Sequence, residues 1–296
     1  MTGPMFSILI PTRNRPDTFR HSLQTVLNQP GDDFEIVVSD NASGPGTLDV
    51  IREAESPRIR YLRSDEVLPM TDNWEKGLQA CTGQYVTILG DDDGLVPSSL
   101  PCARLLLSKT KARVLNWSPH TYWWPDTIVH WNKNRLIAKL GNGAHWYGAS
   151  SMLKLFYDGS MGFDRLPMIY SSFVHRDCIE TAVKKHGSYF CIPHVPDVVS
   201  GVINLIENDQ ILYSDRPLSI RGNSGKSNGT AQWARSLGGE QRESYFKDER
   251  ARLQDIIHPH LVPSPNLKPF VSVQNYVTVV ALSAHNFYIS AIFQSI

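Results

Sequence analysis

The stretch Tyr85-Val86-Thr87-Ile88-Leu89-Gly90-Asp91-Asp92-Asp93-Gly94 decides the fold, because a mostly apolar run leads directly into three aspartates. The run predicts a buried strand, and Gly94 predicts a turn. Three consecutive carboxylates repel one another, so we expect a divalent cation to neutralise them. Magnesium is usually held by one or two carboxylates plus substrate phosphates. The alternative for the tripeptide alone is a solvated acidic turn.

Strand and helix patterns alternate around this stretch. Strands are predicted at residues 6–10, 34–38, 59–62, 85–89 and 113–117, with helical patterns between them. Asp72-Asn73-Trp74-Glu75 has the form of a capping box, which predicts that a helix starts there. This alternation predicts an α/β fold with a doubly wound, mostly parallel sheet. Since ligands of such sheets bind beyond the carboxyl ends of the strands, Thr12 to Arg15, Asp40 and the three aspartates should share one crevice.

Composition excludes several classes of protein. Lysine plus arginine and aspartate plus glutamate number 29 each, so a general nucleic-acid binder is not expected. The four cysteines have no C-x-x-C spacing, which indicates reduced thiols and a cytoplasmic protein. Residues 1–10 lack a basic leader, so no signal peptide is expected. Residues 269–296 carry no Asp, Glu, Lys or Arg, but polar residues interrupt them, so we expect packing on the domain, on a second copy or on a membrane surface rather than a span.

The second half of the chain contributes three further candidates. Five of the seven tryptophans lie between Trp117 and Trp146, which predicts an aromatic layer or hairpin core, with a sugar-stacking platform as the functional alternative. Asp197 precedes an apolar helix and can cap it. A carboxylate at the mouth of a buried helix is also partly desolvated, which raises its proton affinity toward that of a general base. Glycines around Lys226 indicate a lid or a plain surface loop.

Four N-terminal segments, together with the acidic turn, resemble the family 2 glycosyltransferases of GT-A fold. They are Ser7 to Arg15, Val37 to Ser43, Asn73 with Gly77 and Ala80, Gly83 to Val86, and Asp91 to Asp93. The resemblance implies that Pro11, Thr12, Asn14, Arg15, Asp40, Asn73, Asp91 and Asp92 bind a nucleotide sugar, with Asp40 on the nucleobase. It also implies that Asp197 is the catalytic base.

One departure from the family concerns the metal. The family often has Asp-x-Asp-Asp at this turn, and Gly90 stands at the first aspartate. The resemblance therefore implies Mg²⁺ or Mn²⁺ on Asp93 or Asp92, and we favour Asp93, with Asp91 or Asp92 on the ribose.

The function implied by the resemblance is inverting, metal-dependent transfer of a sugar from a nucleoside-diphosphate sugar, most simply UDP-linked, to an acceptor hydroxyl. The acceptor would be a glycan, a lipid-linked molecule or a small molecule in polysaccharide or glycoconjugate biosynthesis, in the cytoplasm or at the inner face of the membrane. We expect a catalytic domain over residues 1–230, divided into a nucleotide-sugar half (1–117) and an acceptor half (118–230). A C-terminal, mainly helical extension is expected over 231–296.

Three alternatives remain open. A sugar-phosphate nucleotidyltransferase would share the sheet and the acidic site, but it would usually need an early glycine-rich basic loop, and Pro11 to Arg15 contains no glycine. A glycosidase would need two opposed carboxylates and no nucleotide. A non-catalytic sugar- or nucleotide-binding module could keep the aspartates without a competent base. Release of nucleoside diphosphate in the presence of metal separates a transferase from all three.

Overall fold

The computed structural model describes residues 3–190 and 196–227, so the expectations for residues 231–296 lie outside the described residues. The strands are β1 (Phe6–Thr12), β2 (Phe34–Asp40), β3 (Ile59–Arg63), β4 (Tyr85–Ile88), β5 (Gly94–Leu95), β6 (Val114–Trp117), β7 (His120–Trp123), β8 (Leu136–Ile137), β9 (Ala144–Gly148), β10 (Ser172–His175), β11 (Gln210–Ser214) and β12 (Ser219–Asn223). The helices are α1 (Pro16–Leu27), α2 (Pro45–Ala54), α3 (Met70–Ala80), α4 (Ser99–Thr110), α5 (Ala149–Tyr157), α6 (Arg176–His186) and α7 (Pro196–Ile206), with short 3-10 turns η1 (His130–Asn132), η2 (Phe163–Arg165) and η3 (Ile169–Ser171).

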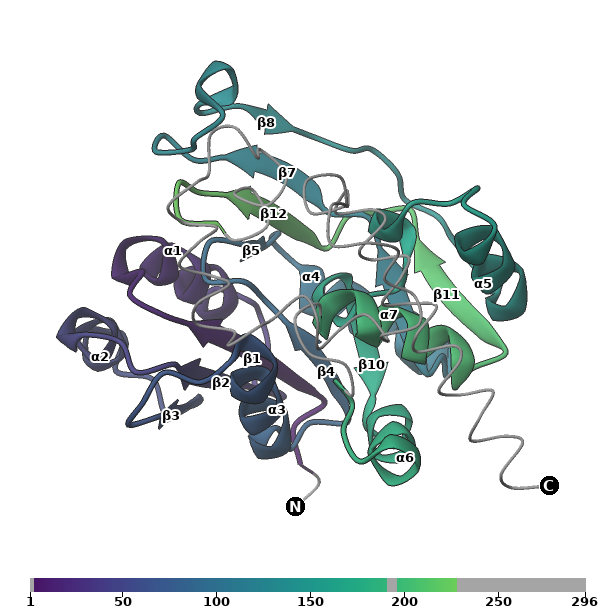
Figure 1. Cartoon of the computed structure of the whole chain (residues 1–296), viewed down its shortest axis with the longest axis horizontal. Helices are drawn as coiled ribbons and strands as arrows, with labels where there is room; N and C mark the ends of the chain where they lie inside the picture. The colour runs from purple at the N-terminus through teal and green to yellow at the C-terminus, as the bar shows by residue number, and fades with distance from the viewer. Residues whose placement is uncertain (1–2, 191–195, 228–296) are drawn as a thin grey trace, which may run out of the picture.

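An eight-stranded sheet in the order β3-β2-β1-β4-β10-β6-β11-β9 forms the centre of the fold (Figure 1). Strands β3, β2, β1 and β4 are parallel neighbours, whereas β10 runs antiparallel to both β4 and β6. The parallel part follows from the helical crossovers between successive strands, because a parallel connection needs one. The prediction of an α/β fold with a doubly wound, mostly parallel sheet is confirmed.

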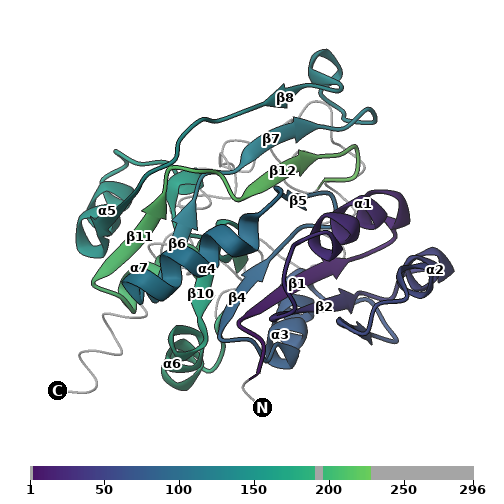
Figure 2. The same ribbon diagram turned by 180° about the vertical axis from the view of Figure 1, so that it is seen from behind.

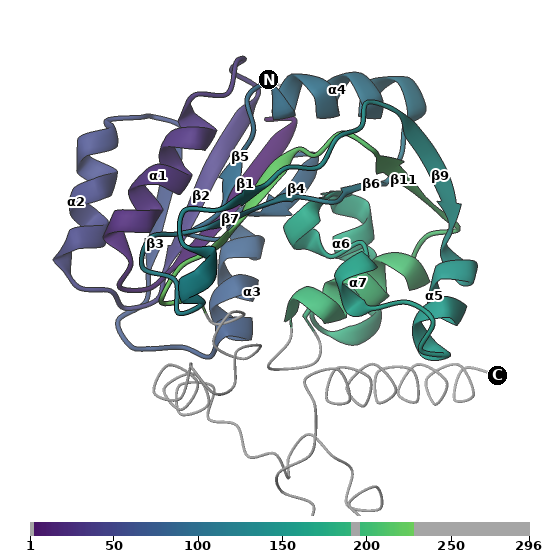
Figure 3. The same cartoon turned by 90° about the horizontal axis from the view of Figure 1, so that it is seen from above.

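Helices cover both faces of this sheet, as the view from above shows (Figure 3). Side chains of α1, α2 and α4, among them Phe19, Val50 and Leu100, pack on one face. On the other face, α3, α5, α6 and α7 contribute Trp74, Phe156 and many smaller apolar residues. Two hydrophobic cores separated by a sheet buried on both faces explain why its strands read as apolar runs rather than as alternating patterns.

A second sheet, in the order β5-β12-β7-β8, begins where the acidic turn ends (Figure 2). Strand β5 directly follows Asp93, and β12 pairs antiparallel with it through Ile220 and Gly94. Strand β7 then pairs parallel with β12. Residues 219–223, more than a hundred positions along the chain, are thereby brought beside the three aspartates.

The predicted start of the third helix is wrong. Helix α3 begins at Met70 with Pro69 as its N-cap, and no side chain caps it, so Asp72 and Asn73 lie inside the first turn. Asn73 instead bonds to the neighbouring strand: Ser39 Oγ donates to Asn73 Oδ1 (2.9 Å), and Asn73 Nδ2 donates to the Ser39 carbonyl (3.2 Å). Asp72 therefore lies inside the helix rather than at the cap position that the pattern assigns to it.

The boundary expected between residues 117 and 118 falls between β6 and β7, and strands from both sides of it share the large sheet. The three described cysteines, Cys81, Cys102 and Cys178, are free thiols. Within residues 3–190 and 196–227, no helix has the length and apolar character needed to cross a membrane.

Candidate active site

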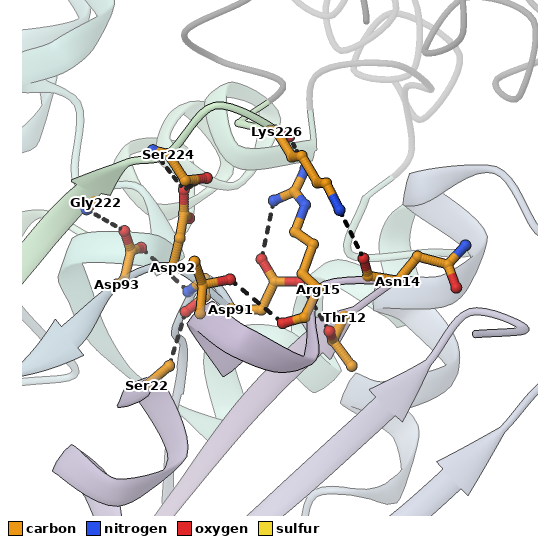
Figure 4. Close-up of polar contacts among 12 residues, drawn as sticks. Thr12, Asn14, Arg15, Ser22, Asp91, Asp92, Asp93, Gly222, Ser224 and Lys226 are labelled. Atoms are coloured by element: carbon orange, nitrogen blue, oxygen red, sulfur yellow. Dashed lines mark hydrogen bonds and ion pairs between the residues drawn. The ribbon is translucent and has the colours of Figure 1, made fainter. Parts of the chain in front are cut away.

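The three aspartates lie at the carboxyl end of β4, beside the end of β1 (Figure 4). The parallel register pairs Leu9 with Ile88, so the loops that follow both strands leave the sheet at the same edge. Thr12 Oγ1 consequently donates a hydrogen bond of 2.8 Å to Asp91 Oδ2, across 79 positions of sequence. The expected convergence of Thr12 and the acidic turn is present in the structure.

Asp91 is also paired with a cation. Arg15 Nη1 lies 2.9 Å from Asp91 Oδ1, and the aspartate is only 5% exposed. Because each oxygen of Asp91 has a side-chain donor, its charge is compensated within the protein. Arg15 also donates to the carbonyl of Lys226, which joins the loop after β1 to the loop after β12.

Asp92 faces the loop after β12. The hydroxyl of Ser224 donates to Asp92 Oδ2 at 2.6 Å, and the backbone amide of Ser224 donates to the same oxygen at 3.1 Å. Trp124 Nε1 donates to the Asp92 carbonyl at 2.9 Å. Burial raises the pKa of the Asp92 carboxyl above its usual value, although the charge of Arg15 opposes this shift.

Asp93 is held by backbone amides. Gly222 N donates to Asp93 Oδ1 (2.7 Å), and Gly90 N donates to Asp93 Oδ2 (3.1 Å). Burial and the neighbouring charge of Asp92 raise the pKa of Asp93 to about 7. The Asp93 carboxylate therefore links β12 to the acidic turn by a hydrogen bond. Its ionised form is unfavourable in this environment unless a cation lies nearby.

The loop that follows β1 is braced from two directions. Asn14 N donates to Ser43 Oγ, Gly44 N donates to Asn14 Oδ1 (both 2.9 Å), and Lys226 Nζ lies 3.5 Å from the Asn14 carbonyl. Pro11 lies inside β1, opposite Ser39 of β2. Lys226 thus contacts the expected nucleotide loop, which fits the lid interpretation better than that of an isolated surface loop.

Asp40 lies at the end of β2, as expected, but its side chain has no exposed surface. Ser43 N donates to Asp40 Oδ1 (2.9 Å), and the Tyr61 hydroxyl donates to Asp40 Oδ2 (2.5 Å). The carboxylate organises the turn after β2, and its burial does not support the direct nucleobase contact expected from the sequence. Asn73, bonded at both ends of its amide to Ser39, likewise faces the protein interior.

Asp197 lies in the first turn of α7 and is partly exposed. Burial raises the pKa of Asp197, while the backbone amide of Val198 and the charge of Arg221 oppose the shift. Arg221 also opposes the raised pKa of Asp93, after the larger effects of burial and of Asp92. The positive charge of Arg221 therefore favours the ionised form of both Asp93 and Asp197.

Four residues of this site were not singled out from the sequence as site residues: Tyr170, Arg221, Trp124 and Ser224. Each comes from a segment far along the chain from residues 91–93, and none belongs to a local motif. The tryptophan-rich region supplies one of them, since Trp124 bonds to Asp92. In the same region Trp117 is buried and donates to Ser219, whereas Trp131 is 73% exposed, so the region is part core and part surface.

The donor set of the site suits a hard divalent cation. No group of three or more His, Cys, Asp or Glu residues arranged to hold a metal occurs among the residues that the structure describes. Magnesium does not require such a group, because it usually takes one or two carboxylates and completes its shell with water and substrate phosphates. The buried Asp92 and the adjacent, partly buried Asp93 fit that pattern.

Comparison with known proteins agrees with this geometry. Residues 7–147 match the model of a family described as Glycosyl transferase family 2. Over 100 residues, the chain is 33% identical to a GalNAc(5)-diNAcBac-PP-undecaprenol beta-1,3-glucosyltransferase of Campylobacter jejuni, covering 33% of this chain and 32% of that protein. Over 98 residues it is 34% identical to a PGL/p-HBAD biosynthesis glycosyltransferase of Mycobacterium bovis, covering 32% of this chain and 38% of that protein. The matched segment spans about a third of the length of these relatives.

Among solved structures, the chain resembles S. aureus TarS residues 1–349 in complex with UDP-GlcNAc. The TM-score is 0.58 at 14% sequence identity, over 83% of this chain and 73% of that one. A complex of the same protein with UDP gives a TM-score of 0.57 at 15% identity, over 82% of this chain and 72% of that one. At this identity, the likeness establishes the shared fold.

Proposed function

Since residues 7–147 of this chain belong to glycosyl transferase family 2, we propose that the protein is an inverting glycosyltransferase that uses a nucleoside-diphosphate sugar. The observation that carries this proposal is the contact of the acidic turn with Thr12 and Arg15. On the other side, hydrogen bonds through η3 link β4 to the first turn of α7, which carries Asp197. The first group can hold an anionic nucleotide, and the second can accept a proton.

The nucleotide would lie along the loop after β1. Thr12, Asn14 and Arg15 line this loop, and Asp91 between Thr12 and Arg15 is the candidate for the ribose. The guanidinium of Arg15 supplies a forked cationic donor, which suits phosphate oxygens. A UDP-linked donor is supported by the UDP-GlcNAc and UDP complexes of the structurally similar TarS.

A divalent cation, Mg²⁺ or Mn²⁺, would be held by Asp92 and Asp93, and when bound it would offset charge developing on the departing diphosphate. A carboxylate has about four lone-pair positions, so the hydrogen bonds to these aspartates leave room for a cation. We rank Asp92 first because its side-chain partner, the Ser224 hydroxyl, can turn away. Asp93 is fixed by two backbone amides and would act mainly through its charge.

Asp197 would act as the general base. The acceptor oxygen attacks the anomeric carbon, the bond from that carbon to the diphosphate oxygen breaks with its electron pair leaving on the diphosphate, and the acceptor proton passes to Asp197. One displacement of this kind inverts the anomeric centre. A general base of this type contributes about 10²–10⁴-fold to the rate.

The test is metal-dependent release of nucleoside diphosphate from a panel of nucleotide sugars. Asp197→Asn should lower turnover by about 10²–10⁴-fold while the Kd for UDP stays unchanged. Asp177→Asn is the matched control, since Asp177 also lies in the first turn of a helix, and its change should leave turnover intact. Full activity of Asp197→Asn would contradict the assignment. Pyrophosphate release from a nucleoside triphosphate and a sugar phosphate would favour the nucleotidyltransferase instead.

The acceptor is the least constrained part of the proposal. A lipid-linked acceptor in glycoconjugate biosynthesis is supported by the name of the C. jejuni relative, which contains the term PP-undecaprenol. Incubation with radiolabelled UDP-sugars and undecaprenyl-diphosphate glycans, followed by extraction into organic solvent, would detect such a product.

A further inference from the structure

Tyr170 occupies a fixed position beside the acidic turn. It belongs to η3, whose neighbouring groups are bonded from two sides: Ile169 N donates to Ser200 Oγ (3.0 Å) of α7, and Thr87 Oγ1 donates to the Ile169 carbonyl (3.0 Å) from β4. The ring packs against Trp74 of α3, with centroids 5.2 Å apart. Contacts from three elements therefore determine where the phenol points.

Gly90 leaves the space that this phenol uses. A Cβ atom at position 90 would lie 2.9 Å from the Tyr170 hydroxyl and 2.7 Å from Asp93 Oδ2. Both distances are too short for a real side chain, so the hydroxyl and the carboxylate together fill the volume above Gly90. Gly90, at the start of the acidic turn, has no side chain of its own. The Tyr170 hydroxyl of η3 therefore supplies a polar group at this position.

The hydroxyl faces negative charge. Burial, followed by the charges of Asp93, Asp92, Asp91 and Asp197, raises the pKa of Tyr170 well above its ordinary value. The group is therefore a neutral hydrogen-bond donor at physiological pH. Tyr170 is only partly buried, and its hydroxyl is not among the buried side-chain atoms that lack a hydrogen-bond partner in the described part of the chain.

We propose that Tyr170 determines donor specificity by donating a hydrogen bond to an oxygen of the sugar being transferred. This inference rests on the proposed function. In that function the acidic turn holds the diphosphate end of the donor and Asp197 receives the acceptor proton, so the transferred sugar lies between them. The Tyr170 hydroxyl lies beside Gly90 and Asp93, and η3 is bonded through Ser200 to the first turn of α7, so Tyr170 is an uncharged donor between the two groups.

The test compares Tyr170→Phe with the unaltered protein by titrating UDP and intact UDP-sugars in the presence of Mn²⁺. UDP contains the nucleotide and the diphosphate but no sugar, so its Kd should stay within about twofold. The Kd of the preferred UDP-sugar and its kcat/KM should worsen by about three- to tenfold, the effect of one neutral hydrogen bond. Deoxy analogues of that sugar should identify the hydroxyl group that Tyr170 contacts. The analogue that lacks this hydroxyl should bind equally to the unaltered protein and to Tyr170→Phe.

Tyr157→Phe is the matched control, since Tyr157 is, like Tyr170, a partly buried phenol, and it lies at the end of α5, where desolvation raises its pKa to about 12. It should bind UDP and UDP-sugars as the unaltered protein does. Unfolding curves for both variants establish that they are folded.

Four results would overturn the assignment. Equal loss of UDP and UDP-sugar affinity in Tyr170→Phe would place the phenol on the diphosphate. Unchanged affinity for both would make it a packing residue, and an equal loss in Tyr157→Phe would make the effect non-specific. If the unaltered protein binds UDP but no UDP-sugar, the assignment of Tyr170 fails while nucleotide binding stands. If it binds neither UDP nor a UDP-sugar, the proposed function is overturned as well.

Discussion

The three adjacent aspartates have different neighbours, so they cannot be equivalent. Asp91 is paired with the cationic Arg15, Asp92 accepts hydrogen bonds from Ser224, and Asp93 accepts them from two backbone amides. Asp91 and Asp92 each accept from a side-chain hydroxyl that can rotate away, but Asp91 is also paired with Arg15. Differences of this kind arise from contacts across more than seventy positions of sequence, which is why the tripeptide itself gives no ranking of its members.

Residue-scale reasoning from the sequence succeeded where a side chain follows a strand directly. Thr12 and Asp91 meet because two parallel strands end together, which the strand pattern already implies. The sequence does not predict that Asp40 and Asn73 are buried. Their side chains bond to Tyr61 and Ser39, which are distant in the sequence. Tyr170 had no sequence signal at all, since its role depends on the missing side chain of Gly90.

The acid limb of the pH profile is a prediction at the residue scale. A general base works when deprotonated, so activity is present above its pKa and is lost as the pH falls through it. Burial raises the pKa of Asp197, with Val198 N and Arg221 opposing and the neutral Tyr170 nearby. With metal saturating, we expect kcat/KM to decline on the acid side with a midpoint above the ordinary aspartate value of about 3.9.

That profile can be assigned to one group by substitution. In Asp197→Asn the residual kcat/KM should lose this limb, whereas in the α6 control Asp177→Asn the limb should stay where it is. Persistence of the same limb in Asp197→Asn would show that another group causes it.

At the scale of elements, the close approach of β12 to the acidic turn is the contact that assembles the site. A Cβ atom at Gly222 would overlap the carbonyl oxygen of Asp92 and would lie 2.8 Å from Trp124 Nε1. The sequence does not show this close approach, because the neighbours of Gly222 come from the acidic turn after β4 and from Trp124, directly after β7. The glycine is needed for proximity to another backbone rather than for an unusual backbone conformation.

We therefore expect Gly222→Ala to destabilise the protein by about 1–3 kcal/mol, the usual cost of overpacking, because β12 must shift away from the turn. Denaturant unfolding measures the change. Gly148→Ala is the matched control, since its nearest atom would be Ser151 Oγ at 3.6 Å, and it should unfold as the unaltered protein does. Equal midpoints for Gly222→Ala and the control would contradict the packing argument.

At the scale of the whole molecule, one sheet joins the two expected halves. Strand β10, from the later half, lies between β4 and β6 of the earlier half, and the order of strands therefore departs from the order of sequence. The alternation of strands and helices predicts the first four strands and their parallel arrangement. The alternation does not predict that β10 inserts antiparallel between β4 and β6. This pairing depends on residues of both neighbouring strands, which a local pattern does not contain.

This arrangement predicts that a nucleotide stabilises the fold as a unit. Ligand that binds only the folded state stabilises it by about 2.7 kcal/mol at a hundred times its Kd. For a domain of this size each kcal/mol raises Tm by about 2–4 °C, so UDP with Mn²⁺ should raise Tm by about 5–10 °C in a single transition. Thermal unfolding followed by circular dichroism measures this shift.

Because the diphosphate would bind partly through the metal, a chelator should remove most of the shift, and so should Asp92→Asn. Asp49→Asn, an exposed aspartate of α2, should keep it. A shift that survives both the chelator and Asp92→Asn would mean that Arg15 and the loop after β1 bind the diphosphate without a metal. An absent shift in the unaltered protein would contradict nucleotide binding at the joint edge of β1 and β4.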